Sequence, residues 1–200
     1  MANIAKATKL AAVNTIISNI GQAPVTTLES GNPLVEMAEQ ILDEISRTVQ
    51  SEGWVFNTEY HYPFGRDGNK HIKLTQNILA LDTQPTALNR ATIRDNKLYD
   101  KVNHTFEWEK DMELDVIWLF SFEDLPEAFK NYITIRSANV FAGRSIGSTE
   151  AVKFGEREEI FARASALEHD TQQGDYTVFA DKDNDQSYQS YLPFNAIRRY

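Results

Sequence analysis

The chain has 200 residues, of which 42% are hydrophobic and 24% charged, as in a soluble globular protein of one or two domains. Its net charge of −9 argues against a large basic surface that holds nucleic acid tightly, and the absence of cysteine excludes disulfides and thiolate sites. The first six residues are too polar for the apolar core of a signal peptide, and no apolar run approaches the roughly 20 residues that span a bilayer. We expect a soluble protein made inside a cell.

The N-terminal part of the chain predicts two amphipathic helices joined by a short connector. The first carries apolar residues at helical spacing and stops at a glycine: Leu10, Val13, Ile16, Ile17, Ile20 and then Gly21. The second begins with Asn32 as cap and Pro33 as first helical residue, because proline lacks only an N–H that would be unpaired there. Its apolar face consists of Leu34, Ala38, Ile41, Ile45 and Val49. Helices linked in this way usually pack as a hairpin.

Strand-favouring residues then replace the helical period, and they predict a small antiparallel sheet. The expected strands cover residues 55–64, 71–81, 90–94, 97–102 and 114–120. Asp95 and Asn96 tolerate the left-handed backbone of a tight turn, so they should join the third and fourth strands as a hairpin. The last strand is apolar on both faces in its middle, which indicates a central or covered strand.

Two further helices follow the sheet. The third should begin at Pro126 and close at Gly143, with an apolar stripe of Phe129, Tyr132, Ile133, Arg136, Val140 and Phe141. The fourth should be capped by Ser148 or Thr149 and fade by Gly174. We expect its inner face to carry Phe154, Phe161, Ala164 and Leu167, and its solvent side to carry Glu156, Arg157, Glu158, Glu159 and Arg163. Gly155 interrupts this helix and indicates a bend or a close approach to another helix.

The change of period predicts an α+β fold, in which a four-helix bundle-like helical domain contains an inserted small antiparallel β-sheet domain. Residues 1–54 and 122–174 would form the helical domain, residues 55–121 the sheet domain, and residues 175–200 a C-terminal arm. The arm combines a polar run with aromatic and basic residues. We predict that it binds a partner through Tyr188, Tyr191, Phe194, Arg198, Arg199 and Tyr200.

No catalytic, cofactor-binding or metal-binding motif stands out. The four histidines, at positions 61, 71, 104 and 169, have no metal-ligand spacing. An acidic run could supply the two carboxylates of a polysaccharide hydrolase: Glu107, Glu109, Asp111, Glu113 and Asp115. Alternation would place these odd-numbered residues on one strand face, where a solvated surface is the simpler interpretation. The competing hypotheses are therefore a carboxylate-dependent hydrolase and a helical binding module of a host cell.

Several segments resemble one known family. The run from Ala12 to Leu28, AVNTIISNIGQAPVTTL, is similar to the opening of the tail tubular protein A family, the head-to-tail adaptors of short-tailed phages. Further similar segments are Ile41–Ile45, Val49–Asn57, Lys97–Lys101, Leu125–Phe129 and Gly147–Glu150. They keep the family's order over residues 10 to 174, whereas the region between Tyr60 and Arg90 and the C-terminal arm show little likeness.

The resemblance implies a structural virion protein of the tail, assembled in the host cytoplasm, and not an enzyme. Family members form a twelve-subunit ring that joins the portal protein to the tail nozzle, made of tubular protein B subunits. Double-stranded DNA passes through the lumen during packaging and ejection without specific binding, and no membrane is involved. A charge of −9 on each subunit suits such a conduit, because it repels phosphate groups. The alternative within this setting is a polysaccharide hydrolase associated with the tail.

Overall fold

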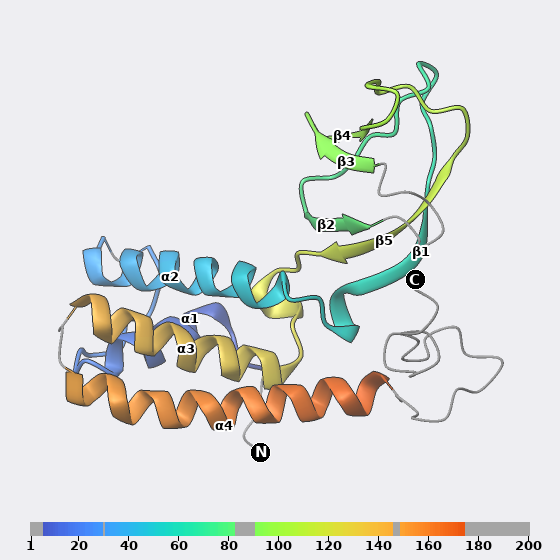
Figure 1. Ribbon diagram of the computed structural model, residues 1–200. Coiled ribbons are helices and arrows are strands. Elements are labelled where there is room, and N and C mark those ends of the chain that lie inside the picture. The colour runs from blue at the N-terminus through green and yellow to red at the C-terminus, as the bar shows by residue number, and fades with distance from the viewer. Residues whose placement is uncertain (1–5, 30, 83–90, 146–148, 175–200) are drawn as a thin grey trace.

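A computed structural model of the chain describes residues 6–29, 31–82, 91–145 and 149–174. The helices are α1 (Lys9–Ser18), α2 (Pro33–Gln50), α3 (Glu127–Ser145) and α4 (Thr149–Gly174), with short 3₁₀ turns η1 (Val55–Asn57) and η2 (Phe122–Asp124). The strands are β1 (Thr58–Phe64), β2 (Ile78–Asp82), β3 (Ala91–Arg94), β4 (Lys97–Asp100) and β5 (Met112–Trp118). All of them pair antiparallel, so the predicted α+β class is confirmed. The sheet part stands over one end of the helices (Figure 1).

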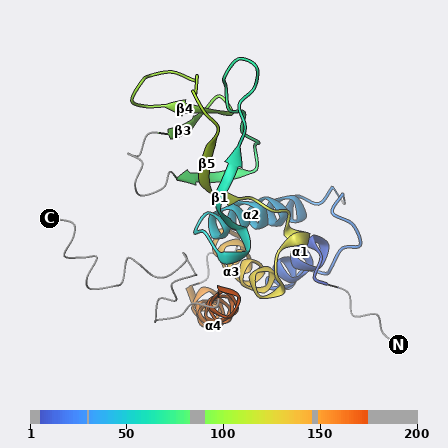
Figure 2. The same cartoon turned by 90° about the vertical axis from the view of Figure 1, so that its right-hand side faces the viewer.

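Helix α3 lies in the middle of the helical part and contacts each of the other three helices (Figure 2). It is therefore buried on more sides than the single stripe that its sequence predicts. Even Lys130 and Thr134 are buried, and the Lys130 ammonium reaches the Glu127 carboxylate at 2.9 Å. Helix α4 packs on α3 and on η1 and forms the outer layer on the side away from α2.

The first two helices follow the sequence closely. The Asn32 side chain accepts a hydrogen bond from the backbone N–H of Leu34 at 3.0 Å, and Pro33 is the first helical residue, as predicted. Helix α1 ends at Ser18, earlier than predicted, and the turn closes at Gly21 with a φ of +76°. Glycine adopts this left-handed conformation without the penalty that a Cβ brings.

The predicted stop of the third helix at Gly143 is wrong by two residues, since α3 continues to Ser145. Arg144 explains the extension. Its guanidinium donates to both carboxylate oxygens of Glu44, at 3.0 and 3.1 Å, and so ties the last turn of α3 to α2. The fourth helix ends at Gly174, as predicted. Thr149 is its first residue and so not its cap, and Ser148, the other predicted cap, lies outside the described residues.

The strands form one three-stranded sheet in the order β1-β5-β2 and one hairpin of β3 and β4. Strand β5 is central, as its apolar residues on both faces predicted. The hairpin turns at Asp95 and Asn96, whose φ values of +51° and +54° confirm the predicted left-handed pair.

Several strand predictions are wrong in part. The strand predicted over 97–102 ends at Asp100, and the strand predicted over 114–120 covers Met112–Trp118 instead. Residues 55–57 form a 3₁₀ turn, because the Asn57 side chain accepts a hydrogen bond from the backbone N–H of Trp54 at 2.8 Å and curls the chain. The strand predicted over 71–81 begins only at Ile78, and it continues one residue further, to Asp82. Within residues 71–77, His71 and Lys73 make isolated bridges to different segments, so no continuous ladder forms.

The described residues bury two hydrophobic clusters, one among the helices and one in the sheet part. Two buried amides join the parts at the end of α2. Gln50 exchanges hydrogen bonds with the backbone of Phe120: its Oε1 accepts at 2.8 Å and its Nε2 donates at 3.1 Å. The Asn57 side chain donates to the carbonyls of Gln50 and Trp118, at 2.8 and 2.9 Å. Side-chain amides thus replace a backbone ladder where the chain passes between the parts.

Candidate interaction surfaces

The residues predicted to bind a partner lie outside the described residues. The last residue that the structure describes is Gly174, and all six predicted residues follow it: Tyr188, Tyr191, Phe194, Arg198, Arg199 and Tyr200. The interaction surfaces described below come from the helices and strands, and the sequence prediction did not single them out as partner-binding.

The acidic run does not occupy one strand face, contrary to the prediction. Glu107, Glu109 and Asp111 precede β5, and only Glu113 and Asp115 belong to that strand. Asp111 binds the backbone N–H and the guanidinium of Arg66, at 3.1 and 3.2 Å. The hydrogen bond from the Arg66 backbone, followed by that from its side chain, lowers the pKa of Asp111. A general acid for glycoside cleavage needs a raised pKa, so the environment of Asp111 favours a structural role.

Two histidines of the sheet part, His61 and His71, have separate partners. The His61 ring lies 3.9 Å from the Asp115 carboxylate, whereas the Nδ1 atom of His71 lies 3.5 Å from the Lys97 ammonium. Within the described ranges, no group of three or more His, Asp or Glu side chains is arranged to hold a metal ion. None of the helices in the described part of the chain is long and apolar enough to cross a membrane.

Helix α4 meets α3 through small residues. Ala162 and Ala166 are buried, and Gly155 lies directly against Asn139 of α3. A Cβ built on Gly155 would come within 2.6 Å of the Asn139 Cγ atom, so the backbones approach closely at this point. The close approach inferred from Gly155 is therefore confirmed, and a larger apolar residue would not fit there.

Replacing Gly155 with alanine should destabilise the chain by about 1–2 kcal/mol, because Asn139 must move and lose its 3.0 Å hydrogen bond to Glu159. In an Asn139→Ala background, the same substitution should be neutral or stabilising by up to about 1 kcal/mol, since alanine favours a helix over glycine. Urea unfolding of the two single variants and the double variant measures this change of sign. Equal effects of Gly155→Ala in both backgrounds would show that Asn139 is not the obstacle.

Polar residues complete the inner face of α4, so the prediction that Glu159 and Arg163 face solvent is wrong. Arg163 donates to both carboxylate oxygens of Glu52, at 3.2 and 2.8 Å, and to the Tyr132 hydroxyl at 2.9 Å. The hydrogen bonds to Glu52 and then Tyr132 raise the pKa of Arg163 above its ordinary value. Arg136 also donates to the Tyr132 hydroxyl, at 2.9 Å. The network fixes the rotation of α4 about its own axis.

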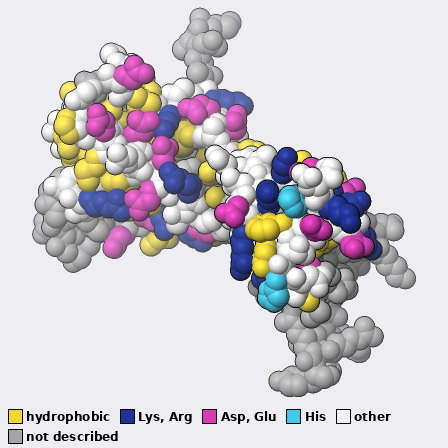
Figure 3. Space-filling model, turned by 90° about the horizontal axis from the view of Figure 1, so that it is seen from above, with side chains coloured by type: hydrophobic (Ala, Val, Ile, Leu, Met, Phe, Trp, Pro, Cys, Tyr) yellow, Lys and Arg dark blue, Asp and Glu magenta, His cyan; other side chains and the backbone are white. Residues whose placement is uncertain are grey.

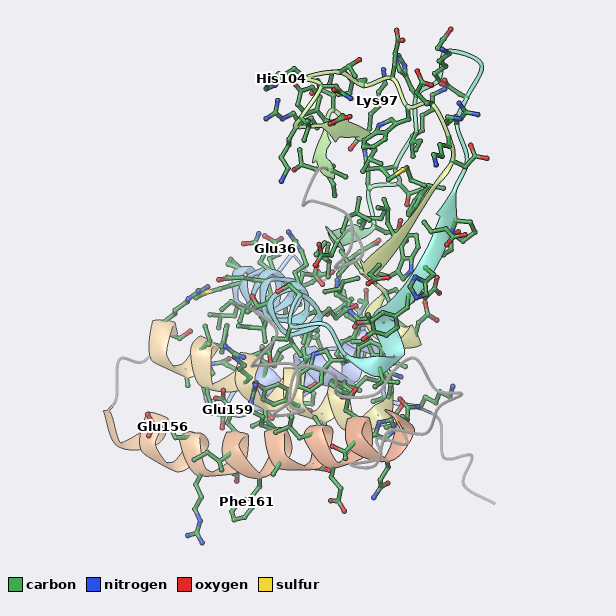
Figure 4. The ribbon with its side chains drawn as sticks, turned by 45° about the vertical axis from the view of Figure 1, so that its right-hand side comes forward. Glu36, Lys97, His104, Glu156, Glu159 and Phe161 are labelled. Atoms are coloured by element: carbon green, nitrogen blue, oxygen red, sulfur yellow. The ribbon has the colours of Figure 1, made fainter. Side chains whose placement is uncertain are left out.

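That rotation turns Phe161, Ala164 and Leu167 of the predicted inner face outward, while the side chain of Phe154 lies outside those that the structure describes. Ile160, Phe161 and Leu167 are 68%, 64% and 44% exposed, and Ala164 between them is exposed too. Figure 4 shows Phe161 pointing away from α3 while Glu159 points toward it. We call the surface formed by Arg157, Ile160, Phe161, Ala164, Leu167 and Glu168 the outer face of α4. Large apolar side chains grouped on one exposed helix face are typical of a surface that another protein covers.

A second surface, with half-buried aromatic rings beside an exposed arginine, lies on the β3–β4 hairpin and the segment that follows it. The register pairs Thr92 with Tyr99 and Arg94 with Lys97, so these four residues share one face. The Arg94 guanidinium stacks 4.0 Å from the centre of the Tyr99 ring, and the Tyr99 and Phe106 rings lie 5.0 Å apart. We call Thr92, Arg94, Lys97, Tyr99 and Phe106 the hairpin face. In the view from above, Lys and Arg side chains gather near the histidines of this end of the molecule (Figure 3).

Comparison with known proteins gives two concordant results. The family described as tail tubular protein matches residues 10–176. Tail tubular protein A of Klebsiella phage KP34 is 24% identical over 163 residues, which cover 80% of this chain and 86% of that protein.

Proposed function

The chain belongs to the tail tubular protein family and is a structural protein of a bacteriophage tail, and from this we propose that it is the head-to-tail adaptor of the virion. Twelve copies would form a ring that joins the portal protein to the tail nozzle, made of tubular protein B subunits. The observation that carries the proposal is the family match over residues 10–176, which covers the described helices and strands apart from the first residue of α1.

The architecture suits this role if the two hydrophobic clusters mark two domains. In this proposal, residues 1–54 and 122–174 form one four-helix bundle and residues 55–121 an inserted sheet domain. A subunit of this kind can present helices to one neighbour and the sheet to another. The net charge of −9 supports a channel that passes DNA without binding it specifically, since twelve such subunits repel phosphate groups.

Mass photometry of the protein with and without the portal tests the adaptor role. We expect the portal particle to gain the mass of twelve copies, because a ring matched to a twelvefold portal fills every site at once. A preparation that leaves the portal mass unchanged but cleaves capsular polysaccharide would support the alternative, a tail-associated hydrolase. Loss of such cleavage in Glu107→Gln or Glu113→Gln variants would then identify the catalytic carboxylate.

The C-terminal arm, residues 175–200, is a further proposed contact with the portal or an adjacent subunit. Its aromatic residues and the Arg198–Arg199 pair suit a partner surface with acidic groups, because guanidinium groups match carboxylates in geometry. We expect Tyr188–Tyr200 to gain protection from hydrogen exchange when the portal is added. A truncation after Gly174 that still assembles at the full rate would exclude this docking role.

A further inference from the structure

We propose that the outer face of α4 in one copy packs against the hairpin face of the next copy around the ring. The inference rests on the proposed adaptor function and adds to it the two surfaces through which neighbouring copies meet. Nothing in the family match names these surfaces. They follow from exposure, residue type, charge and position in the fold.

The outer face of α4 has the composition of an interface core with a charged edge. Ile160, Phe161 and Leu167 supply apolar area, and the small Ala164 leaves room between them for a partner side chain. The Arg157 guanidinium lies 5.8 Å from the centre of the Phe161 ring. The inner face of the same helix contacts α3 and carries the Arg163 network. Within the described ranges, the exposed apolar side chains of the outer face take no part in these contacts.

The hairpin face offers matching groups. Tyr99 and Phe106 form an aromatic pair with Arg94 and Lys97 beside them, and the Lys97 ammonium lies 5.8 Å from the centre of the Phe106 ring. Tyrosine, phenylalanine and arginine are enriched in the buried centres of protein interfaces, where they combine apolar area with a polar edge. Such a face accepts an apolar helix that is bordered by acidic groups.

Charge complementarity selects this pairing over contact between two α4 helices. The surface on and beside the outer face of α4 is negatively charged, because its exposed acidic residues outnumber the exposed Arg157: Glu156, Glu158 and Glu168. The hairpin face carries Arg94 and Lys97, and none of its five residues is acidic. Two outer faces of α4 would repel each other, whereas the hairpin of a neighbouring copy attracts them.

The two surfaces also lie where a ring requires them. The hairpin and α4 lie on opposite sides of α2 in both ribbon views (Figures 1 and 2). A closed ring of more than two copies needs two different, complementary surfaces on each copy, since a surface that pairs with itself stops at a dimer. Opposite placement lets each copy offer its hairpin to one neighbour and its α4 to the other.

Single cysteines test the contact directly, because the chain contains none. Ala164→Cys on α4 and Thr92→Cys on the hairpin are small changes at a helix surface and a strand surface. We expect a short bismaleimide to link an Ala164→Cys copy to a Thr92→Cys copy, and each variant alone to remain uncrosslinked. The double variant should give a ladder of dimers, trimers and larger species, both at high concentration and on the portal. Circular dichroism checks that each variant is folded.

Glu36→Cys on the exposed start of α2 serves as the matched control with Thr92→Cys and should give no crosslink (Figure 4). Phe161→Ala should weaken the copy–copy contact at least about tenfold, as expected for an apolar residue at the centre of an interface. Two results would overturn this inference and leave the adaptor function in place. In the first, multi-copy assemblies form but give no crosslinked ladder. In the second, crosslinks form only between the Ala164→Cys positions of two copies and give dimers alone. Absence of any assembly, with or without the portal, overturns both.

Discussion

Replacing Gln50 with leucine should lower the free energy of unfolding by about 2–4 kcal/mol. The side chain is fully buried and pairs with both backbone groups of Phe120, while its Nε2 also donates to the Ser46 hydroxyl at 3.0 Å. Leucine fills a similar volume but leaves the Phe120 N–H and C=O without partners. Each unpaired buried group costs about 1–3 kcal/mol. Urea unfolding followed by tryptophan fluorescence measures the change.

Gln40→Leu on the same helix is the control for this substitution. Gln40 is exposed, so its replacement should change the free energy of unfolding by no more than about 0.5 kcal/mol. A cost below about 1 kcal/mol for Gln50→Leu would show that the amide pair does not join the helical and sheet parts.

Phe129→Ala should be the most destabilising substitution considered, at about 3–5 kcal/mol. Phe129 belongs to α3, and its ring is fully buried. The centre of this ring lies 4.8 Å from the centre of the Trp54 ring and 4.6 Å from the centre of the Phe56 ring. Removing it leaves a cavity among aromatic rings that cannot close around the gap. Thermal unfolding followed by circular dichroism should show a correspondingly large fall in midpoint.

Phe161→Ala makes the same chemical change on the neighbouring helix, with the opposite expectation. Its ring is 64% exposed on the outer face of α4, so the free chain should lose no more than about 0.5 kcal/mol. A loss as large as that of Phe129→Ala would mean that Phe161 is buried within its own chain. Phe161 would then lie on the inner face of α4, as the sequence predicted, and could not belong to the proposed contact surface.

The sequence predicted most of the fold because local signals were strong. The Asn32–Pro33 start of α2, the Asp95–Asn96 turn and the central position of β5 each follow from residue types that favour one conformation. The errors occurred where tertiary contacts decide the outcome. Arg144 extends α3 past a glycine by binding Glu44, and Asn57 turns residues 55–57 away from a strand.

The reversed face of α4 shows why the candidate surface could not be predicted. Hydrophobic periodicity marks a face that will be covered, but it does not say whether the cover comes from the same chain or another. The prediction therefore placed Phe161 and Leu167 on the inner face. In the structure the inner face consists of small residues: Ala162 and Ala166 are buried, and Gly155 lies directly against Asn139. The one sequence signal that pointed correctly was the glycine, since it indicates close backbone contact.

Electron microscopy of the purified protein mixed with the portal of the same virion tests the adaptor role most directly. The account predicts portal particles that carry an additional ring with twelvefold symmetry on the side that faces the tail. Bare portal particles at saturating protein concentration, or single copies bound without a closed ring, would contradict it.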